Sequence, residues 1–313
     1  MDNMKIFNLT HADLDGITCA IILKKIAQES RADFSYQTLT YKEIHNDLPV
    51  YIDNSVQMFD KVFLTDVSVA EDSLATKKIR EYNNIFVIDH HISSKHLVDC
   101  SRARINTTEN CCASQMVYDM YKDKFTTLKT KNFEKLVFLT DWYDTWKFNT
   151  CSHKKGECFC DMARSLNYLF DFYGYAKFLL EFQEGLRPLN DIEKKYLKGR
   201  FTELGEFIKN DTPIEFCYKK VIFTVCKYNL VNEVAHYYLK HNKNTKVVVV
   251  ANTTGNSLSF RSQDNDINLG DVVQEIANSW GFSGGGHKLA AGCLTDGSPD
   301  TIEKIIKQLL EKI

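Results

Sequence analysis

The sequence has little proline, almost no net charge and no long uncharged apolar run. Its 313 residues include four prolines, 39 basic and 41 acidic side chains, and the net charge is -2. No segment reaches the length needed to span a bilayer, and no apolar leader follows the first residues. We therefore expect a cytoplasmic protein with no membrane partner and no global positive field to hold long nucleic acid.

Ten cysteines are present, and in a cytoplasmic protein we expect them to be reduced thiols rather than a disulfide framework. Cys151, His153, Cys158 and Cys160 share one polar stretch. This stretch is either a structural metal site or an exposed insertion, and its spacing, which does not match a paired Cys-x-x-Cys module, favours the insertion. Aromatic residues between positions 168 and 178 form either a base-stacking surface or, as is more common, part of the core.

Alternating strand and helix patterns fill the first part of the chain. Strands are predicted at residues 5–9, 34–40, 61–64 and 85–88, and helices at 16–29, 41–46 and 71–82. This alternation is typical of an α/β fold with a mostly parallel sheet and helices on both faces. Later in the chain, β-rich strings alternate with helical patterns at residues 221–226, 232–241, 247–252, 257–261, 270–280 and 299–313. They predict a second, smaller α/β domain.

The two predicted domains are joined by a charged helical stretch. We expect a first domain over residues 1–185, a connecting helix over 186–212 and a second domain over 213–313.

Three strings rich in aspartate and histidine follow three of the predicted strands. They are His11-Ala12-Asp13-Leu14-Asp15-Gly16, Thr65-Asp66-Val67-Ser68 and Ile88-Asp89-His90-His91. The carboxyl ends of parallel strands meet at one edge of a sheet, where ligands bind. Carboxylates packed together repel one another unless cations lie among them. One such string also fits an ordinary turn or helix cap, but three together predict a metal site.

Oxygen and imidazole donors without cysteine are typical of manganese or magnesium rather than of a zinc thiolate site. His11, Asp13 and Asp15 alternate in the sequence, so in an extended segment they would project to one side. Asp66 comes from a separate strand end, which makes it the best candidate for a carboxylate that bridges two ions.

Two further ligand assignments are less direct. His90 and His91 are adjacent, so we expect one to bind metal and the other to face substrate or support a ligand. Asp141, in the Thr140–Asp144 segment, is either a fourth source of carboxylate ligands or a helix-capping residue.

Together these strings resemble the motifs of the DHH phosphoesterase superfamily, named for Asp89-His90-His91. A distal string, Gly284-Gly285-Gly286-His287-Lys288-Leu289-Ala290-Ala291-Gly292, resembles the signature of the DHH-associated C-terminal domain, so the likeness covers nearly the whole chain. The resemblance implies two manganese ions, with magnesium as the other candidate metal, and it favours Asp141 over Asp144. The implied ligands are His11, Asp13 and Asp66 for one ion, and Asp15, Asp66, His90 and Asp141 for the other.

The second domain offers groups that suit a phosphate. A glycine-rich turn exposes backbone N–H groups, and an arginine can make bidentate phosphate contacts. The resemblance implies that Arg261 and His287 grip a substrate phosphate or nucleotide, next to Ser262 and the glycines of residues 284–286. The alternatives are a flexible loop for the glycines and a surface ion pair for Arg261.

The reaction implied by the resemblance is phosphodiester hydrolysis. Asp66 would bridge the ions, and His91, next to Asp89, would contact a non-bridging phosphate oxygen. We expect an exonuclease of the nano-RNase type that degrades short single-stranded oligonucleotides to mononucleotides, with 3'-phosphoadenosine 5'-phosphate as a further candidate substrate.

The expected partner is thus a short oligonucleotide or small nucleotide, not a long duplex, and a homo-oligomer is compatible with the sequence. The first alternative is a soluble cyclic-dinucleotide phosphodiesterase. The second is a nucleotide-binding module without catalysis, against which the complete set of metal ligands argues.

Overall fold

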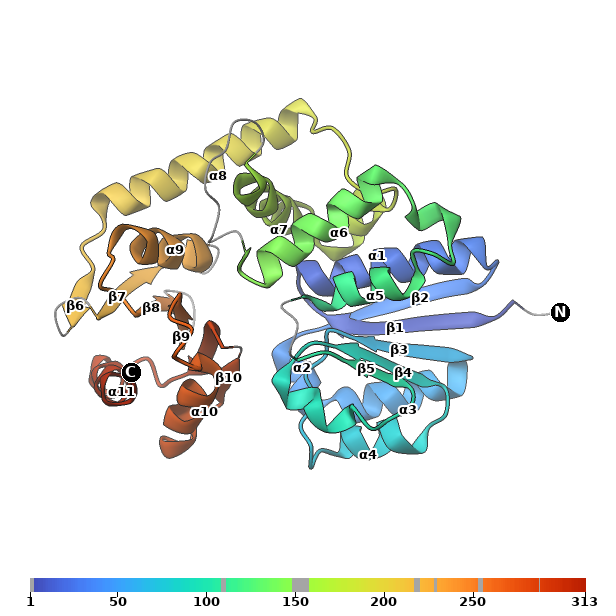
Figure 1. Cartoon of the computed structure of the whole chain (residues 1–313), viewed down its shortest axis with the longest axis horizontal. Coiled ribbons are helices and arrows are strands. Elements are labelled where there is room, and N and C mark those ends of the chain that lie inside the picture. Colours follow the sequence, from blue (N-terminus) through green and yellow to red (C-terminus); the bar gives the residue numbers. More distant parts are fainter. Residues whose placement is uncertain are drawn as a thin grey trace. The chain divides into compact units, whose positions relative to one another are not determined.

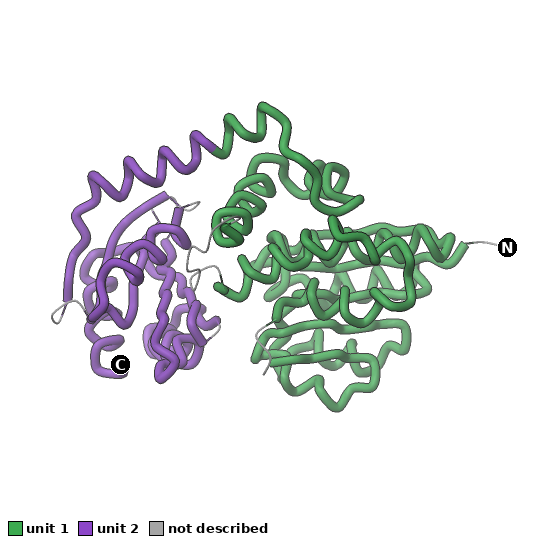
Figure 2. The backbone as a smooth tube through the Cα atoms, turned by 45° about the horizontal axis from the view of Figure 1, so that its top comes forward, with its two compact units in different colours: residues 1–197 green, residues 198–313 purple. Residues whose placement is uncertain are grey.

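The chain forms two compact units, residues 1–197 and 198–313, in a computed structural model (Figure 1, Figure 2). The structure describes residues 3–107, 111–147, 158–216, 220–227, 230–252, 256–286 and 288–313. Helix α8 (Asp191–Asn210) begins in the first unit and ends in the second. No helix within the described ranges is both long enough and apolar enough to cross a membrane.

A parallel five-stranded sheet forms the centre of the first unit, in the order β2-β1-β3-β4-β5 (Figure 1). Its strands are β1 (Lys5–His11), β2 (Asp33–Leu39), β3 (Lys61–Thr65), β4 (Ile85–Asp89) and β5 (Ala103–Ile105). The chain places β2 on one side of β1 and β3 on the other, so the strand order reverses between β1 and β3. Such a reversal opens a crevice at the carboxyl ends of the two strands, where ligands bind in α/β folds.

Helices cover both faces of this sheet (Figure 1). On one face lie α1 (Leu14–Glu29) and α5 (Ala113–Tyr121), and on the other α2 (Tyr41–Asn46), α3 (Leu48–Met58) and α4 (Leu74–Glu81). Helices α6 (Lys131–Asp144) and α7 (Phe159–Phe182) pack against α1, and short 3-10 helices span Ile92–Leu97 and Thr126–Leu128. The predicted parallel sheet with helices on both faces is confirmed.

The second unit contains a mixed six-stranded sheet in the order β10-β11-β9-β8-β7-β6. Strands β7 and β8 pair in parallel and the other neighbours are antiparallel. Its elements are β6 (Ile214–Phe216), β7 (Val221–Cys226), α9 (Val231–His241), β8 (Val247–Asn252), β9 (Ser257–Ser262), α10 (Leu269–Ser279), β10 (Gly284–Gly286), β11 (Ala290–Leu294) and α11 (Pro299–Lys312). One apolar cluster packs α10 and α11 on the sheet, and another packs α8 and α9 on it. The predicted smaller α/β domain is confirmed.

The cysteines depart from expectation at one position. Seven of them are free thiols, but Cys160 is disulfide-bonded, so the expectation of reduced thiols is wrong for this residue. Cys151 and His153 lie outside the described residues, and so does any metal site that would need them.

Gly185 occupies a position of the first unit where the backbone leaves no room for a side chain. Its φ of +91° is in the left-handed region, and a Cβ there would lie 2.5 Å from the backbone of Asn132 and Phe133. Gly174, in a kink of α7, also has a positive φ of +67° but no atom within 4 Å of its Cβ position. We expect Gly174→Ala to cost about 1 to 3 kcal/mol of unfolding free energy for conformation alone. Gly185→Ala should cost roughly 1 to 3 kcal/mol more, because the backbone has to move.

Urea unfolding of the two variants, followed by circular dichroism, measures this difference. An equal loss of unfolding free energy in the two variants would show that the backbone around Gly185 moves to accept a Cβ without an energetic penalty.

Candidate metal centre

The carboxyl ends of β1, β3 and β4 bring acidic and histidine side chains together. His11 ends β1, Asp66 follows β3, and His90 and His91 follow β4. The side chains form three overlapping groups, and within each group the ligand atoms lie within 4.8 Å of one another. The groups are His11, Asp13 and Asp66; Asp66, His90 and His91; and Asp15, His90 and Asp144. Asp66 and His90 each belong to two groups, which is the arrangement needed for two neighbouring cations with shared ligands.

The chain is not extended as far as Asp15, as the alternation of residues suggested, because α1 begins at Leu14. Asp13 is the N-cap of α1: its Oδ1 accepts a hydrogen bond from the Gly16 backbone N–H at 2.9 Å, and its Oδ2 lies 2.8 Å from His11 Nδ1. Asp15 therefore sits in the first helical turn. A Cβ on Gly16 would lie 2.1 Å from the His11 carbonyl oxygen, so only glycine allows this close turn.

Asp15 is held by the N-terminus of another helix. Its side chain is buried, and its two oxygens accept hydrogen bonds from the backbone N–H groups of Ala113 and Ser114 at 2.8 and 2.9 Å. These amides begin α5, whose dipole favours a negative charge at this end. Burial nevertheless raises the pKa of Asp15. Because Asp15 and Ala113 are 98 residues apart in the sequence, no local sequence pattern predicts this contact.

Asp66 lies at the middle of the cluster in a strained conformation. Its φ is 56°, a left-handed value that a non-glycine residue adopts only when its surroundings impose it. Oδ1 is 3.4 Å from His90 Nε2 and Oδ2 is 3.9 Å from His11 Nδ1. Burial, followed by the charges of Asp13 and other carboxylates, raises the pKa of Asp66 well above its usual value.

Asp89 orients the neighbouring His91. It is fully buried, and its Oδ1 lies 2.7 Å from His91 Nδ1, a contact that fixes the direction of the imidazole. The strand ends at Asp89, so strand alternation no longer separates His90 from His91. Their rings meet edge to face at 4.7 Å, and both are grouped with Asp66.

The structure brings Asp144 into the cluster, whereas the resemblance favoured Asp141 as the fourth source of ligands. Asp144 Oδ2 is 3.6 Å from His90 Nε2. Burial and the charges of Asp15 and Asp13 outweigh the attraction of His90 and raise the pKa of Asp144 to about 8.

Asp141 is engaged elsewhere. Its Oδ1 accepts a hydrogen bond from the Cys112 backbone N–H at 2.9 Å, and its Oδ2 pairs with Lys147 Nζ at 2.5 Å. Asp141 does act on a helix terminus, as the capping alternative suggested, but on that of α5 rather than that of its own helix. Asp144 is the last residue of α6, where a carboxylate opposes the helix dipole and needs a partner.

This donor set fits hard divalent cations. Carboxylate oxygens and imidazole nitrogens dominate it, and such ligands suit manganese and magnesium. Asp66 Oδ2 and Asp144 Oδ2 are buried, and in the described part of the chain neither has a hydrogen-bond partner. A buried carboxylate oxygen without a partner is costly. Cations at this position would satisfy both oxygens and offset the burial and the repulsion that raise the pKa values of Asp66 and Asp144.

In the second unit, Arg261 is already well coordinated. Its Nε and Nη2 donate to Asn232 Oδ1 at 3.2 and 2.8 Å, and its Nη1 donates to the carbonyl oxygens of Phe260 and Ala291 at 2.9 and 3.2 Å. A guanidinium carries five N–H donors. Four of them thus hold the group in place, and the expected bidentate phosphate contact would require some of these bonds to open.

The other expected phosphate contacts of this unit have a different geometry. Ser262 is buried, donates to the Lys246 carbonyl oxygen at 2.7 Å and accepts from the Asp264 N–H at 3.0 Å, so its hydroxyl serves the fold. The glycines of residues 284–286 form edge strand β10 rather than the turn we expected. His287 lies outside the described residues.

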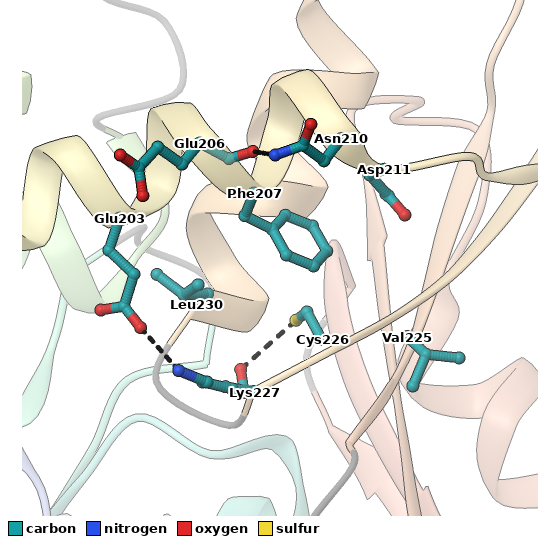
Figure 3. A pocket seen from close by; sticks show the side chains of 9 residues that line it. All are labelled: Glu203, Glu206, Phe207, Asn210, Asp211, Val225, Cys226, Lys227 and Leu230. Atoms are coloured by element: carbon teal, nitrogen blue, oxygen red, sulfur yellow. Dashed lines mark hydrogen bonds and ion pairs between the residues drawn. The ribbon is translucent and has the colours of Figure 1, made fainter.

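A separate hollow of about 410 Å³ lies in the second unit (Figure 3). Its charged lining is mainly acidic, from Glu203, Glu206 and Asp211, with Lys227 paired to Glu203 at 3.0 Å. Asp211 accepts hydrogen bonds from the hydroxyl groups of Thr224 and Tyr238. This negative charge repels a phosphate group, so the hollow is unsuited to bind the phosphate-containing substrate expected for this protein.

Half of the aromatic residues between positions 168 and 178 are interior. Tyr168, Phe170 and Phe178 are buried, which confirms the core interpretation for them, whereas Phe172 and Tyr175 are partly exposed. Sequence reasoning missed a different aromatic residue, Tyr41, whose ring packs on His11. Its place directly after the β2 strand end, at the same edge of the sheet, could have identified it.

Comparison with known proteins finds two family matches. Residues 5–140 match the DHH family, N-terminal domain, and residues 218–313 match the DHHA1 domain. The chain is 22% identical to oligoribonuclease NrnB of Bacillus subtilis, with 92% of this chain and 72% of the relative covered. It is 24% identical to a 3',5'-cyclic-nucleotide phosphodiesterase of Helicobacter pylori, with 99% of both covered.

Solved structures share the fold. RecJ from Thermus thermophilus, in complex with Mn2+, superposes with a TM-score of 0.62 at 14% identity, and the match covers 98% of this chain and 52% of RecJ.

The two aspartates of α6 can be told apart by metal affinity. We expect Asp144→Asn to weaken Mn2+ binding by at least roughly tenfold, because a buried anionic donor is lost. Asp141→Asn should keep the affinity, because it removes only the pair with Lys147 and retains an acceptor for Cys112. Calorimetric titration with Mn2+ measures both. A larger loss in Asp141→Asn would return this residue to the ligand set in place of Asp144.

Proposed function

This chain belongs to the DHH superfamily, as a DHH N-terminal domain joined to a DHHA1 domain, and from that membership we propose that it hydrolyses short single-stranded oligonucleotides to mononucleotides. It is a metal-dependent hydrolase. The observation that carries the proposal is the pair of overlapping ligand groups that share Asp66 at the reversal of strand order.

We assign one cation to His11, Asp13 and Asp66. The other is assigned to Asp66 and to a further set of donors, namely Asp15, His90 and Asp144. Manganese is the proposed metal, with magnesium as the alternative. When bound, such a pair lowers the pKa of a water molecule and neutralises charge on the attacking and leaving oxygens of a phosphodiester. Asp66, which is buried and has a strained backbone, would be shared by the two ligand sets.

His91 is proposed to contact the phosphate. The Asp89 carboxylate accepts a hydrogen bond from His91 Nδ1–H, so the ring is oriented with Nε2 away from Asp89. When both ring nitrogens are protonated, Nε2–H can donate a hydrogen bond to a non-bridging phosphate oxygen. Asp89 is therefore a positioning residue, and its proposed role in catalysis is indirect.

The second domain is proposed to bind the remainder of the substrate. We retain residues 1–185 as the catalytic domain, 186–212 as the connecting helix and 213–313 as the substrate domain. Arg261 would bind a phosphate after some of its hydrogen bonds to Asn232 and to backbone carbonyl oxygens open, with His287 and the backbone of residues 284–286 as further donors. The protein is proposed to work in the cytoplasm.

The choice of substrate rests on the relatives. NrnB, an oligoribonuclease by name, supports a short single strand. A second candidate function, hydrolysis of cyclic nucleotides, is favoured by the match to the cyclic-nucleotide phosphodiesterase over 99% of both chains. Both substrates are small phosphodiesters, which the same pair of cations would attack. A binding module without catalysis would not need the complete set of buried donors.

A substrate panel with Mn2+ tests the proposal. We expect the highest kcat/KM on linear strands of about two to five nucleotides, with lower values on cyclic mononucleotides, cyclic dinucleotides and 3'-phosphoadenosine 5'-phosphate. Asp66→Asn should lose roughly a thousandfold or more of the activity, since several kcal/mol of charge stabilisation depend on the cations. Asp119→Asn, which changes an exposed carboxylate of α5 paired with Lys122, is the matched control.

Higher activity on the cyclic compounds would support the second candidate. Full activity of Asp66→Asn would refute metal-dependent hydrolysis at this centre.

A further inference from the structure

Tyr41 presents an exposed aromatic ring directly beside the metal centre. It is the first residue of α2 and is 68% exposed, yet its ring packs on that of His11 with centroids 4.3 Å apart and planes inclined by 55°. His11 is grouped with Asp13 and Asp66. An aromatic surface accessible to solvent thus lies one ring away from the proposed reaction site.

The backbone that carries Tyr41 is held firmly. A capping box joins Thr40 and Glu43: the Thr40 N–H donates to Glu43 Oε2 at 2.8 Å, and the Glu43 N–H donates to Thr40 Oγ1 at 3.4 Å. The Ala12 N–H donates to the Leu39 carbonyl oxygen at 2.9 Å, which ties the loop after β1 to the end of β2. A fixed backbone reduces the entropy lost when the side chain engages a ligand.

Exposure alone does not indicate a binding role, because single exposed apolar residues are common on protein surfaces. Met58 is 65% exposed and sits at the end of α3. What distinguishes Tyr41 is its contact with a proposed metal ligand. Its aromatic character matters as well, because a flat ring can stack on another flat ring, whereas an aliphatic side chain cannot.

A second tyrosine contacts the same segment of backbone. Helix α7 is kinked at Gly174, and the next residue, Tyr175, donates its hydroxyl hydrogen to the Ala12 carbonyl oxygen at 3.2 Å. Its side chain is 38% exposed. Two partly exposed tyrosines from separate helices therefore contact the stretch from His11 to Ala12, next to the centre.

We propose that Tyr41 is the stacking platform for the nucleobase next to the scissile phosphate. This inference rests on the proposed function and adds a base-binding subsite to it. Stacking on an aromatic ring tolerates every base, because each base has a π face. Tyr41 would then select nucleotides over other phosphodiesters without selecting a sequence, which suits an enzyme for short strands of any composition.

The inference can be tested with matched substrates that lack one base. Dinucleotides are compared with the same compounds carrying an abasic sugar on the 5' or the 3' side of the phosphate. We expect Tyr41→Ala to raise KM for the complete dinucleotide by roughly tenfold, in keeping with the strength of a base–aromatic stack. On one of the two abasic compounds, Tyr41→Ala and the wild type should have the same KM, and that compound identifies the base that stacks.

Three comparisons exclude other roles for the ring. Tyr41→Phe should restore the KM of the wild type, because the ring and not the hydroxyl binds the base. Tyr41→Ala should bind Mn2+ with unchanged affinity in a calorimetric titration. Met58→Ala, a change at a similarly exposed residue of the same unit, should have no effect.

The inference would be overturned by an equal loss on the complete and both abasic substrates, or by weakened Mn2+ binding in Tyr41→Ala. Either result would mean that Tyr41 only supports His11. A wild type that binds Mn2+ but hydrolyses none of these compounds would instead refute the proposed function, and the stacking role with it.

Discussion

The repulsion among buried carboxylates at the edge of the parallel sheet is the constraint on which this structure depends. Asp13, Asp15, Asp66 and Asp144 lie close enough for each to affect the ionisation of the others. Such a cluster costs free energy that the protein alone offsets only in part. The Gly16 amide and two helix N-terminal amides stabilise Asp13 and Asp15, but among the described residues Asp66 Oδ2 has no hydrogen-bond donor. The negative charge that the protein does not offset is therefore located where two cations would bind.

Carboxylates in and beside the cluster also hold the helices together. Asp15 on α1 and Asp141 on α6 both accept hydrogen bonds from backbone amides at the start of α5, those of Ala113 and Cys112 among them. Three helices of the first unit, α1, α5 and α6, are thus joined at one helix terminus. The catalytic architecture and the packing of the first unit share their residues, so changes at the centre should alter both activity and stability.

The sequence was sufficient to predict the edge of the sheet and most of its acidic residues, because strand patterns are local and parallel strands share one carboxyl edge. The sequence did not predict local conformations that depend on contacts between residues far apart in the chain. The extended alternation expected through Asp15 is replaced by a helical turn, because Asp13 caps α1. The glycines of residues 284–286 pair with β11 as an edge strand, and helix α3 and the three-residue strand β5 gave no clear pattern.

The choice between Asp141 and Asp144 shows this limit most clearly. The two residues are three positions apart on α6, so helical geometry puts them on neighbouring parts of one face and the sequence alone does not separate them. Contacts outside the helix do: the Cys112 amide and Lys147 both donate hydrogen bonds to Asp141. Asp144 ends the helix, where the dipole opposes a negative charge, and its Oδ2 lies 3.6 Å from His90 Nε2. The carboxylate that the fold itself stabilises least is therefore the one with most to gain from a metal ion, which is the physical reason to place it in the ligand set.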